Sequence, residues 1–156
     1  MNKKEINEIK RKESKREVEN FLNKLKYALG SNKVKITFQE KRKTDKTKSI
    51  QFTNKYTISD LFPDEDIVEV LKRELSTLKI EEYLETVKDK VYPQRSDMRV
   101  FVRKYANKYV YIKIRLELLS AMSGYYDDYL FIMSFHYSDK ILKNNDFPYR
   151  GRAREK

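Results

Sequence analysis

The chain contains no cysteine and a single histidine, His136, and this scarcity excludes several kinds of site. Disulfide bridges and thiolate-bound metals need cysteine, and zinc sites draw most of their ligands from cysteine and histidine. We therefore expect no metal and no cofactor. No apolar run approaches the roughly 20 residues needed to span a bilayer, and Met1-Asn2-Lys3-Lys4 lacks the apolar core of a signal peptide. We expect a cytoplasmic protein without a membrane partner.

The composition predicts one globular, strongly basic domain. The chain has 156 residues, of which 39% are hydrophobic and 38% are charged. This length is enough for one domain to bury a core and is short for two domains. It has 35 Lys and Arg residues against 24 Asp and Glu residues, which gives a net charge of +11. A polyanion is the natural partner of such a surface, through neutralisation of phosphates. The alternative explanation is the Lys- and Asn-rich composition of an AT-rich genome.

Two runs in the C-terminal half alternate with the period of two that half-buried strands show. In the run from Tyr109 to Leu118, apolar residues alternate with Tyr109, Tyr111, Lys113, Arg115 and Glu117. In the run from Tyr129 to Tyr137, one side has Phe131, Met133 and Phe135, and the other has Ile132, Ser134 and His136. A turn at Ser123-Gly124 and Asp127-Asp128 would join them. If the runs pair with their apolar sides together, His136 shares a sheet face with Tyr111, Lys113 and Arg115.

The remaining patterns predict an α+β domain over residues 1–156. Helix-like spacing extends from Asn2 to Leu29, with residues 1–16 as a basic arm that is either a solvated helix or a flexible terminus. Two short strands at 34–38 and 50–56 would form a β-hairpin around a Lys-rich loop, Glu40 to Ser49. The elements expected next are an acidic helix from Asp64 to Leu78, a helical turn from Ile80 to Val87 and a strand from Met98 to Tyr105.

Helices packed on a C-terminal antiparallel meander, with strands at 98–105, 109–118 and 129–137, complete the predicted fold. The open face of the meander would be basic, and the acidic segment 60–85 would face away from nucleic acid. Residues 138–156 form a basic tail that is either docked, able to grip phosphates, or flexible.

The predicted basic face could bind a phosphodiester and cleave it. His136 is the candidate for proton transfer near neutral pH, and Tyr111 could donate a proton or orient the phosphate. Positive charge would come from Lys113, Arg99, Arg103 and Arg115, because guanidinium fits a phosphate with two parallel hydrogen bonds. Exposed Tyr109, Tyr105 or Tyr137 could stack on unpaired bases. Each feature also has a structural explanation: a hydrogen-bonded strand histidine, a solvated strand face, and tyrosines at the edge of the core.

The last strands resemble the MqsR family of toxins. Val110-Tyr111-Ile112-Lys113-Ile114 is similar to that family's Val-Tyr-Leu-Lys-Ile strand, and Ile132-Met133-Ser134-Phe135-His136 is similar to its closing Ile-Val-Ser-Phe-Lys. The acidic helix followed by Ile80-Glu81-Glu82-Tyr83 resembles the family's helix and aromatic turn. The similarity covers roughly residues 57–137.

The resemblance implies a RelE-like fold and a messenger-RNA interferase that a cognate antitoxin silences. Tyr111 falls on the family's catalytic tyrosine, and His136 falls where the family has a catalytic lysine. Lys88 corresponds to a lysine further upstream. A family glutamine has no counterpart, and Asp97 and Arg99 lie in its region. With this resemblance, we assign Tyr111, His136, Lys113 and Arg99 to catalysis, and the proposed nucleic-acid contacts are Lys88, Arg95, Arg103, Arg115 and Tyr109.

Two hypotheses about function follow. The first is a toxin-like endoribonuclease that cleaves single-stranded RNA by acid–base chemistry without a metal, and whose partners are RNA and an antitoxin. The alternative is a non-catalytic protein of a mobile element that binds nucleic acid or inhibits a nucleic-acid enzyme. In that case the basic arm and the Arg-rich tail would matter more than His136.

Overall fold

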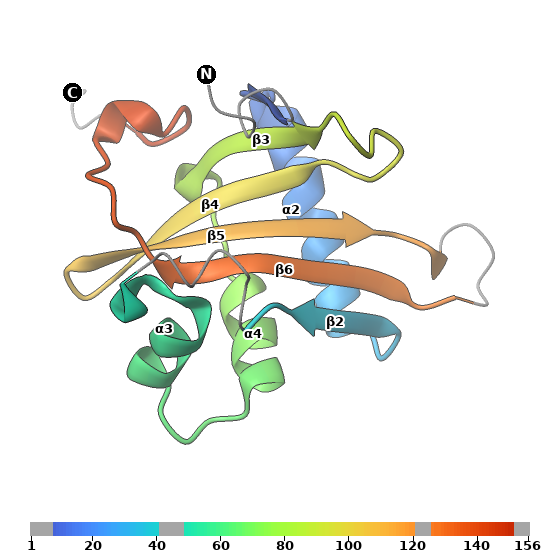
Figure 1. The fold of residues 1–156 in the computed structure, drawn as a ribbon. Helices are drawn as coiled ribbons and strands as arrows, with labels where there is room; N and C mark the ends of the chain where they lie inside the picture. The colour runs from blue at the N-terminus through green and yellow to red at the C-terminus, as the bar shows by residue number, and fades with distance from the viewer. Residues whose placement is uncertain (1–7, 41–48, 121–125, 152–156) are drawn as a thin grey trace.

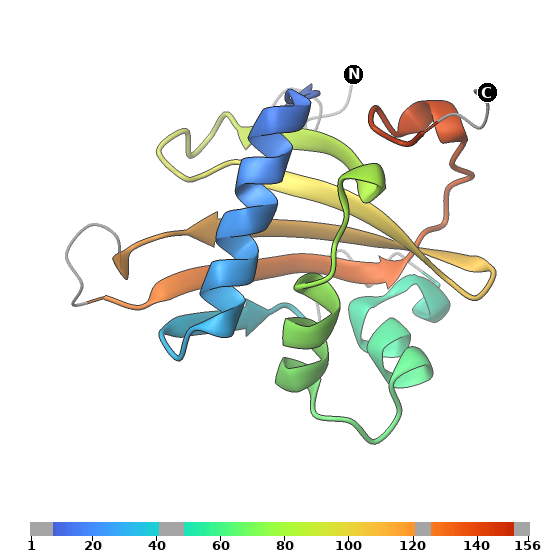
Figure 2. The same ribbon diagram turned by 180° about the vertical axis from the view of Figure 1, so that it is seen from behind.

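A six-stranded mixed β-sheet organises the chain, and three α-helices pack on one side of it (Figure 1 and Figure 2). The computed structural model describes residues 8–40, 49–120 and 126–151. The strands are β1 (Glu8–Arg11), β2 (Val34–Phe38), β3 (Tyr83–Asp89), β4 (Met98–Tyr105), β5 (Lys108–Glu117) and β6 (Asp128–Tyr137). The helices are α2 (Lys15–Gly30), α3 (Asn54–Leu61) and α4 (Ile67–Leu75).

The strand order is β1-β3-β4-β5-β6-β2, and every neighbouring pair is antiparallel except β2 and β6. The predicted α+β class is confirmed. The sheet is mixed rather than antiparallel, because β2 lies parallel to β6 and Val34 pairs with Asp128. β2 and β6 are far apart in the sequence, so local patterns do not reveal this pairing.

The predicted hairpin between 34–38 and 50–56 is wrong. Ile50–Phe52 is a short 3-10 helix, and α3 follows it directly. The side chain of Thr53 caps α3 by accepting a hydrogen bond from the backbone of Tyr56. Residues 41–48, the centre of the predicted loop tip, lie outside the described residues.

The N-terminal helix begins later than predicted. α2 starts at Lys15, because Ser14 forms a capping box with Glu17: each side chain accepts a hydrogen bond from the other residue's backbone N–H. The residues before it, Glu8–Arg11, form the edge strand β1 instead of a helical arm. Residues 1–7 of that predicted arm lie outside the described residues.

The acidic helix is confirmed in part, and the helical turn after it is mostly wrong. Asp66 caps α4 by accepting from the backbone of Glu69, but the helix ends at Leu75 rather than Leu78. Only Ile80–Glu82 is helical in the segment 80–87, and Tyr83–Asp89 is strand β3. This strand is internal to the sheet, since it pairs with both β1 and β4.

The two faces of the sheet differ in what covers them. On the helix side, apolar residues of α2, α3 and α4 pack against buried strand residues such as Phe101, Ile112 and Phe135. The other side, here called the open face, has a smaller apolar cluster that includes Val100, Val102 and Phe147. Figure 2 shows α2 crossing the strands on the helix side and α4 lying beside the end of β2. The open face is therefore the side of the sheet that a ligand can approach.

Side chains of α3 complete the edge of β6 beyond the end of β2. Buried Asn54 donates to the backbone oxygen of Met133 and accepts from the backbone nitrogen of Phe135, both at 2.9 Å. Thr57 accepts from the backbone nitrogen of Tyr137 at 2.9 Å. These contacts satisfy backbone groups that an edge strand would otherwise present to another chain.

Two aromatic residues of the C-terminal segment, Phe147 and Tyr149, pack against the sheet. Phe147 is buried in the open-face cluster, and Tyr149 stacks on Tyr83 of β3 and donates to the backbone oxygen of Glu13. Arg150 lies over the ring of Phe147. Residues 152–156, which include the last basic residues of the predicted tail, lie outside the described residues.

Candidate nucleic-acid interface on the open face

Strand β5 presents its polar side chains to the open face, as the alternation predicted. Val110, Ile112, Ile114 and Leu116 are buried on the helix side. Tyr109, Tyr111, Lys113 and Arg115 therefore lie on the open face, because successive side chains of a strand point to opposite faces. Five of the predicted site residues, these four and His136, share this face.

His136 lies beside Tyr111, as predicted from the pairing of the two runs. The two residues are direct partners in the β5–β6 register, and their rings stack with centroids 5.5 Å apart. His136 is only 8% exposed. Its Nδ1 lies 3.0 Å from the backbone oxygen of Tyr137, and a carbonyl can only accept, so Nδ1 carries a proton. In the neutral ring, Nε2 is then the unprotonated nitrogen.

A β-bulge in β6 corrects the predicted faces of the second run. Lys113 pairs with Ser134 but Ile114 pairs with Ile132, so Met133 is an extra residue. The bulge puts Ile132 on the helix side with Phe135, whereas the prediction separated them. It also moves Phe131, predicted to lie with Phe135, to the open face opposite Arg115.

A pocket of about 390 Å³, here called the sheet pocket, opens on this face where β4 begins and β5 ends. Lys113, Arg115 and Arg95 provide positive charge, and Glu8 and Asp89 provide negative charge. Its apolar and aromatic lining comes from Val87, Met98, Tyr129, Phe131 and Met133. The pocket therefore combines cations with aromatic rings, the two kinds of group that single-stranded nucleic acids contact.

Arg115 is the most distinctive group in the sheet pocket. Its guanidinium carbon lies over the Phe131 ring at 5.0 Å from the centroid, and its side chain is 15% exposed. Its Nε is buried and has no hydrogen-bond partner among the described residues; Glu117 Oε2 is 3.7 Å away. An unsatisfied buried donor costs about 1–3 kcal/mol. An anion that accepts from this nitrogen would recover that free energy.

Lys113 is held at the other side of the pocket by an acidic residue of β1. Its Nζ lies 3.3 Å from Glu8 Oε2, and its side chain is 11% exposed. Asp89 accepts hydrogen bonds from the backbone nitrogens of Val91 and Tyr92, so its charge supports the turn after β3. A phosphate at this position would compete with Glu8 for Lys113.

Arg99 does not join this group, which corrects the predicted cluster. It lies on the helix side and forms a two-point ion pair with buried Glu13, with distances of 2.8 and 2.9 Å. Burial raises the pKa of Glu13, but hydrogen bonds from Arg99 and Thr86 lower it more, so the net pKa lies below the ordinary value. Arg99 is thus a structural partner of a buried carboxylate.

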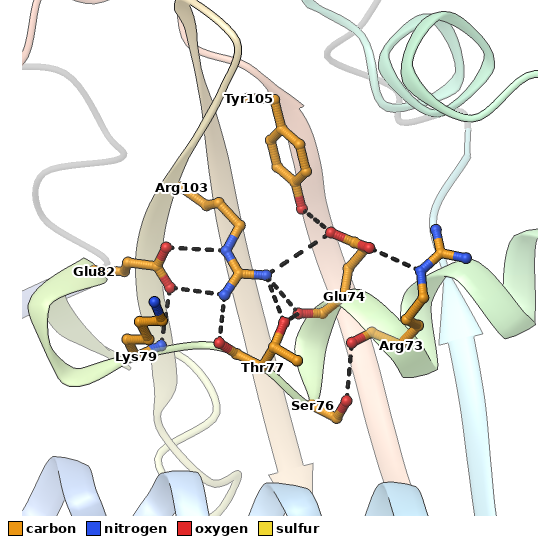
Figure 3. A network of polar contacts seen from close by, with 8 residues as sticks. All are labelled: Arg73, Glu74, Ser76, Thr77, Lys79, Glu82, Arg103 and Tyr105. Atoms are coloured by element: carbon orange, nitrogen blue, oxygen red, sulfur yellow. Dashed lines mark hydrogen bonds and ion pairs between the residues drawn. The ribbon is translucent and has the colours of Figure 1, made fainter.

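Arg103 also lies on the helix side, inside the polar network that Figure 3 shows. Its guanidinium binds both carboxylate oxygens of Glu82, and it donates to the hydroxyl and backbone oxygens of Thr77 and to the backbone oxygen of Glu74. Burial lowers the pKa of Arg103, whereas Glu82 raises it, and the net direction is upward. Its predicted role as a nucleic-acid contact does not fit this position, because these partners occupy its donors.

The remaining predicted residues divide between the two sides. Arg95 lines the sheet pocket and lies over the ring of Tyr92. Lys88 is exposed and alternates with Val87 of the open face, so it points to the helix side. Tyr105 and Tyr137 also lie on the helix side, where they donate to Glu74 and Asp60. In both tyrosines, burial first and then the neighbouring carboxylate raise the pKa.

Sequence reasoning missed the aromatic part of the sheet pocket. Phe131 was predicted to lie with Phe135, and no role was assigned to Tyr129 or Met133. The signal that would have placed Phe131 correctly is the bulge at Met133, and the alternation of the run does not reveal it. The alternation of the run placed Tyr129 in a strand. The residues that line the sheet pocket with it, such as Arg95 and Glu8, come from other parts of the chain.

Neither a metal site nor a membrane helix is found in residues 8–40, 49–120 and 126–151. No three histidine or carboxylate side chains converge there as a metal ion would require. None of the helices in these ranges has the length and apolar character to cross a bilayer. Comparison of the chain with protein-family models, curated proteins and solved structures finds no match.

Proposed function

We propose that the open face binds single-stranded nucleic acid, with RNA as the expected partner. The observation that carries the proposal is Arg115, a partly buried cation that stacks on Phe131 beside Lys113 and whose buried Nε donates no hydrogen bond to the described residues. A phosphate oxygen can accept from Nε and from a neighbouring Nη in the fork geometry that guanidinium favours. The chain's net charge of +11 favours the encounter with a polyanion.

The aromatic residues next to Arg115 support a single strand rather than a duplex. Phe131 and Tyr129 are two positions apart on β6, so both point to the open face, and both are half-buried in the lining of the sheet pocket. Unpaired bases can stack on such rings, whereas the bases of a duplex are already stacked. In this arrangement Tyr129 stacks on a base and Phe131 supports Arg115. Phosphates are held by Arg115, Lys113 and Arg95.

The test is the affinity of the full chain for a fluorescein-labelled single-stranded RNA, measured by fluorescence anisotropy at several salt concentrations. Arg115→Ala should weaken binding by about tenfold and reduce the salt slope by about one, as expected for one phosphate contact. Arg16→Ala is the matched control, because Arg16 is an exposed arginine of α2 on the helix side. It should change the affinity little beyond the general effect of charge.

Two results would overturn this proposal. One is an RNA affinity of the wild-type chain that is too weak to measure at low salt. The other is an equal loss of affinity in Arg115→Ala and Arg16→Ala, which would show attraction to net charge without a site on the open face.

RNA cleavage is a second proposal, and the stacked pair of Tyr111 and His136 favours it. The pair lies beside Lys113 on the open face. Unprotonated Nε2 of His136 is the atom that would take the proton of a 2′-hydroxyl, and the Tyr111 hydroxyl would protonate the departing 5′-oxygen. The oxygen left on the 2′ carbon attacks phosphorus and forms a 2′,3′-cyclic phosphate. The protein would then be a toxin-like endoribonuclease of the MqsR or RelE type, with an antitoxin covering this face.

Cleavage is tested by incubating the protein with single-stranded RNA in EDTA. The expected products carry a 2′,3′-cyclic phosphate, and the double variant Tyr111→Phe/His136→Ala should lose activity while it retains RNA binding. Circular dichroism checks that this variant folds, because His136 is buried. Binding without any cleavage by the wild-type chain would reject the nuclease and leave the binding proposal intact.

A further inference from the structure

A second pocket lies at the opposite end of β5 from Arg115, where the strand begins. It has a volume of about 580 Å³ and is here called the tyrosine pocket, because Tyr56 of α3, Tyr109 of β5 and Tyr137 of β6 line it. Tyr109 belongs to the open face, so this residue connects the pocket with the face on which the sheet pocket opens. The volume is typical of sites for small organic ligands.

The aromatic walls are fixed by the surrounding structure. Tyr56 and Tyr137 meet edge to face with centroids 6.4 Å apart. The hydroxyl of Tyr137 donates to Asp60 at 2.6 Å, and Lys108 Nζ lies over its ring at 4.8 Å from the centroid, so this residue positions a lysine in the pocket. Tyr109 packs on Phe147 at 6.4 Å between centroids. Rings held in this way can stack on a planar ligand with little loss of side-chain entropy.

The polar lining is cationic, in contrast to the other described pockets. Lys108 and Lys140 line the tyrosine pocket, and no lining residue in the described part of the chain is acidic. The sheet pocket contains Glu8 and Asp89, and a third pocket between α2 and the sheet contains Glu13 and Glu17. The tyrosine pocket is therefore complementary to an anion.

Two side-chain amides complete the set of groups. Gln51 and Asn107 line the pocket, and both are exposed. An amide can donate and accept at once, and this pattern matches the edge of a nucleobase. Aromatic walls, amides and lysines are together the groups that recognise a base with its phosphate.

We propose that the tyrosine pocket binds a nucleoside monophosphate unit, with the base between the aromatic side chains and the phosphate near Lys108 and Lys140. This inference deepens the proposed function and rests on it, because the unit would be one nucleotide of the strand that lies on the open face. A free nucleotide has the same chemistry and is the other source of the ligand.

The probe is adenosine 5′-monophosphate, titrated into the ¹⁵N-labelled full chain and followed by NMR. Backbone and side-chain amide signals of Gln51 and Asn107 should shift with saturation. Adenosine, which lacks the phosphate, and ribose 5-phosphate, which lacks the base, should each bind at least about tenfold more weakly than the mononucleotide.

A short RNA that shifts the same signals and is displaced by the mononucleotide would identify the strand as the source. Saturation by the mononucleotide alone, with no effect of RNA, would identify a free nucleotide and contradict the link to the open face.

Matched variants separate the pocket from general charge effects. Tyr56→Leu and Lys140→Ala should each weaken binding of the mononucleotide by about five- to tenfold. Tyr27→Leu and Lys26→Ala are the controls, since both residues are exposed on α2, and they should leave the affinity unchanged. Equal affinity for ribose 5-phosphate, or insensitivity to Tyr56→Leu and Lys140→Ala together, would overturn the proposal. Shifts caused by an acidic peptide but not by the nucleotide would also overturn it and assign the pocket to a protein.

The two proposals can fail separately. If Arg115→Ala leaves RNA affinity unchanged while the mononucleotide still shifts Gln51 and Asn107, the open-face proposal falls and the nucleotide site stands. If Arg115→Ala weakens RNA binding but the mononucleotide shifts nothing in the tyrosine pocket, the nucleotide site falls.

Discussion

Arg103 and Arg115 are both arginines of central strands, yet their surroundings differ completely. Arg103, on the helix side, donates to Glu82, Thr77 and Glu74, and its side chain is 12% exposed. Arg115, on the open face, is 15% exposed, and its buried Nε has no hydrogen-bond partner among the described residues. Nearly equal burial therefore accompanies two different arrangements. All three guanidinium nitrogens of Arg103 donate hydrogen bonds, whereas Arg115 has a buried Nε without a hydrogen bond and a longer ion pair with Glu117 at 3.7 Å.

This difference distinguishes an arginine with structural partners from the arginine that we propose binds a ligand. The Arg103 guanidinium joins α4, the turn after it and β4. Replacing it would remove the ion pair of Glu82, whereas Glu74 would keep its contacts with Arg73 and Tyr105 (Figure 3). The buried Nε of Arg115 contributes little to folding, because no hydrogen bond offsets its desolvation. The comparison predicts that the first arginine controls stability and that the second controls ligand affinity.

The largest effect is expected from Arg103→Ala. The substitution removes the donor to the partly buried carboxylate of Glu82 and to the exposed Thr77, and it should lower the free energy of unfolding by about 2–4 kcal/mol. Urea denaturation followed by circular dichroism measures this change. Arg73→Ala is the control in the same region: Arg73 is exposed and pairs with Glu65 and Glu74, and its loss should leave the denaturation midpoint almost unchanged. Similar midpoints for the two variants would contradict a structural role for the Arg103 network.

A smaller effect, and one that depends on pH, is expected from the buried pair of Glu13 and Arg99. The pKa of Glu13 lies below its ordinary value of 4.5 in the folded chain. The stabilisation is therefore present above that value and is lost as pH falls through the lower, folded-state pKa. Glu13→Gln should lower the free energy of unfolding by about 1.5–3 kcal/mol at pH 7.

The measurement is urea denaturation of wild type and Glu13→Gln at several pH values from neutral to acidic. The difference between the two proteins should shrink once the pH falls below 4.5. A difference that stays constant over this range would show that Glu13 acts through packing and not through its charge.

The smallest effect on stability is expected from Arg115→Met. Methionine preserves the contact with Phe131 and removes the unsatisfied nitrogen, so the free energy of unfolding should change by less than about 1 kcal/mol. RNA affinity should nevertheless fall as it does in Arg115→Ala. Parallel denaturation and anisotropy measurements on one preparation test both statements. A strongly destabilised Arg115→Met would make Arg115 a structural residue like Arg103.

The sequence predicted the central strands well because their signal is local. Alternation in β5 gave the buried set Val110, Ile112, Ile114 and Leu116. Bringing the two apolar sides together put His136 on the same face as Tyr111, and the structure adds that the two are direct partners in the register. The predictions for the first half of the chain were poorer. Val34–Phe38 shows the alternation of a strand, but its partner is β6, nearly a hundred residues away in the chain, and no local pattern records that choice.

The candidate site was predictable to the extent that it depends on β5. Lys113 and Arg115 were assigned to the open face from the alternation alone, and Arg99 and Arg103 were grouped with them because they also alternate with apolar residues. The partners of Arg99 and Arg103 are Glu13 and Glu82, which come from the turn before α2 and the turn before β3. Ion pairs between distant segments depend on how helices dock on the sheet, and a strand pattern does not contain that information.

The sequence by itself determined that this protein has a sheet with one buried and one polar side along β5, because side-chain direction follows from the period of the backbone. It also determined the excess of positive charge and the absence of cysteine. The tertiary structure decided which cations are neutralised, through the approach of Glu13 and Glu82 on the helix side. It also decided, through one extra residue in β6, that Phe131 lies under Arg115. Both outcomes depend on contacts between segments far apart in the chain, and these contacts stabilise the protein only once the chain has folded.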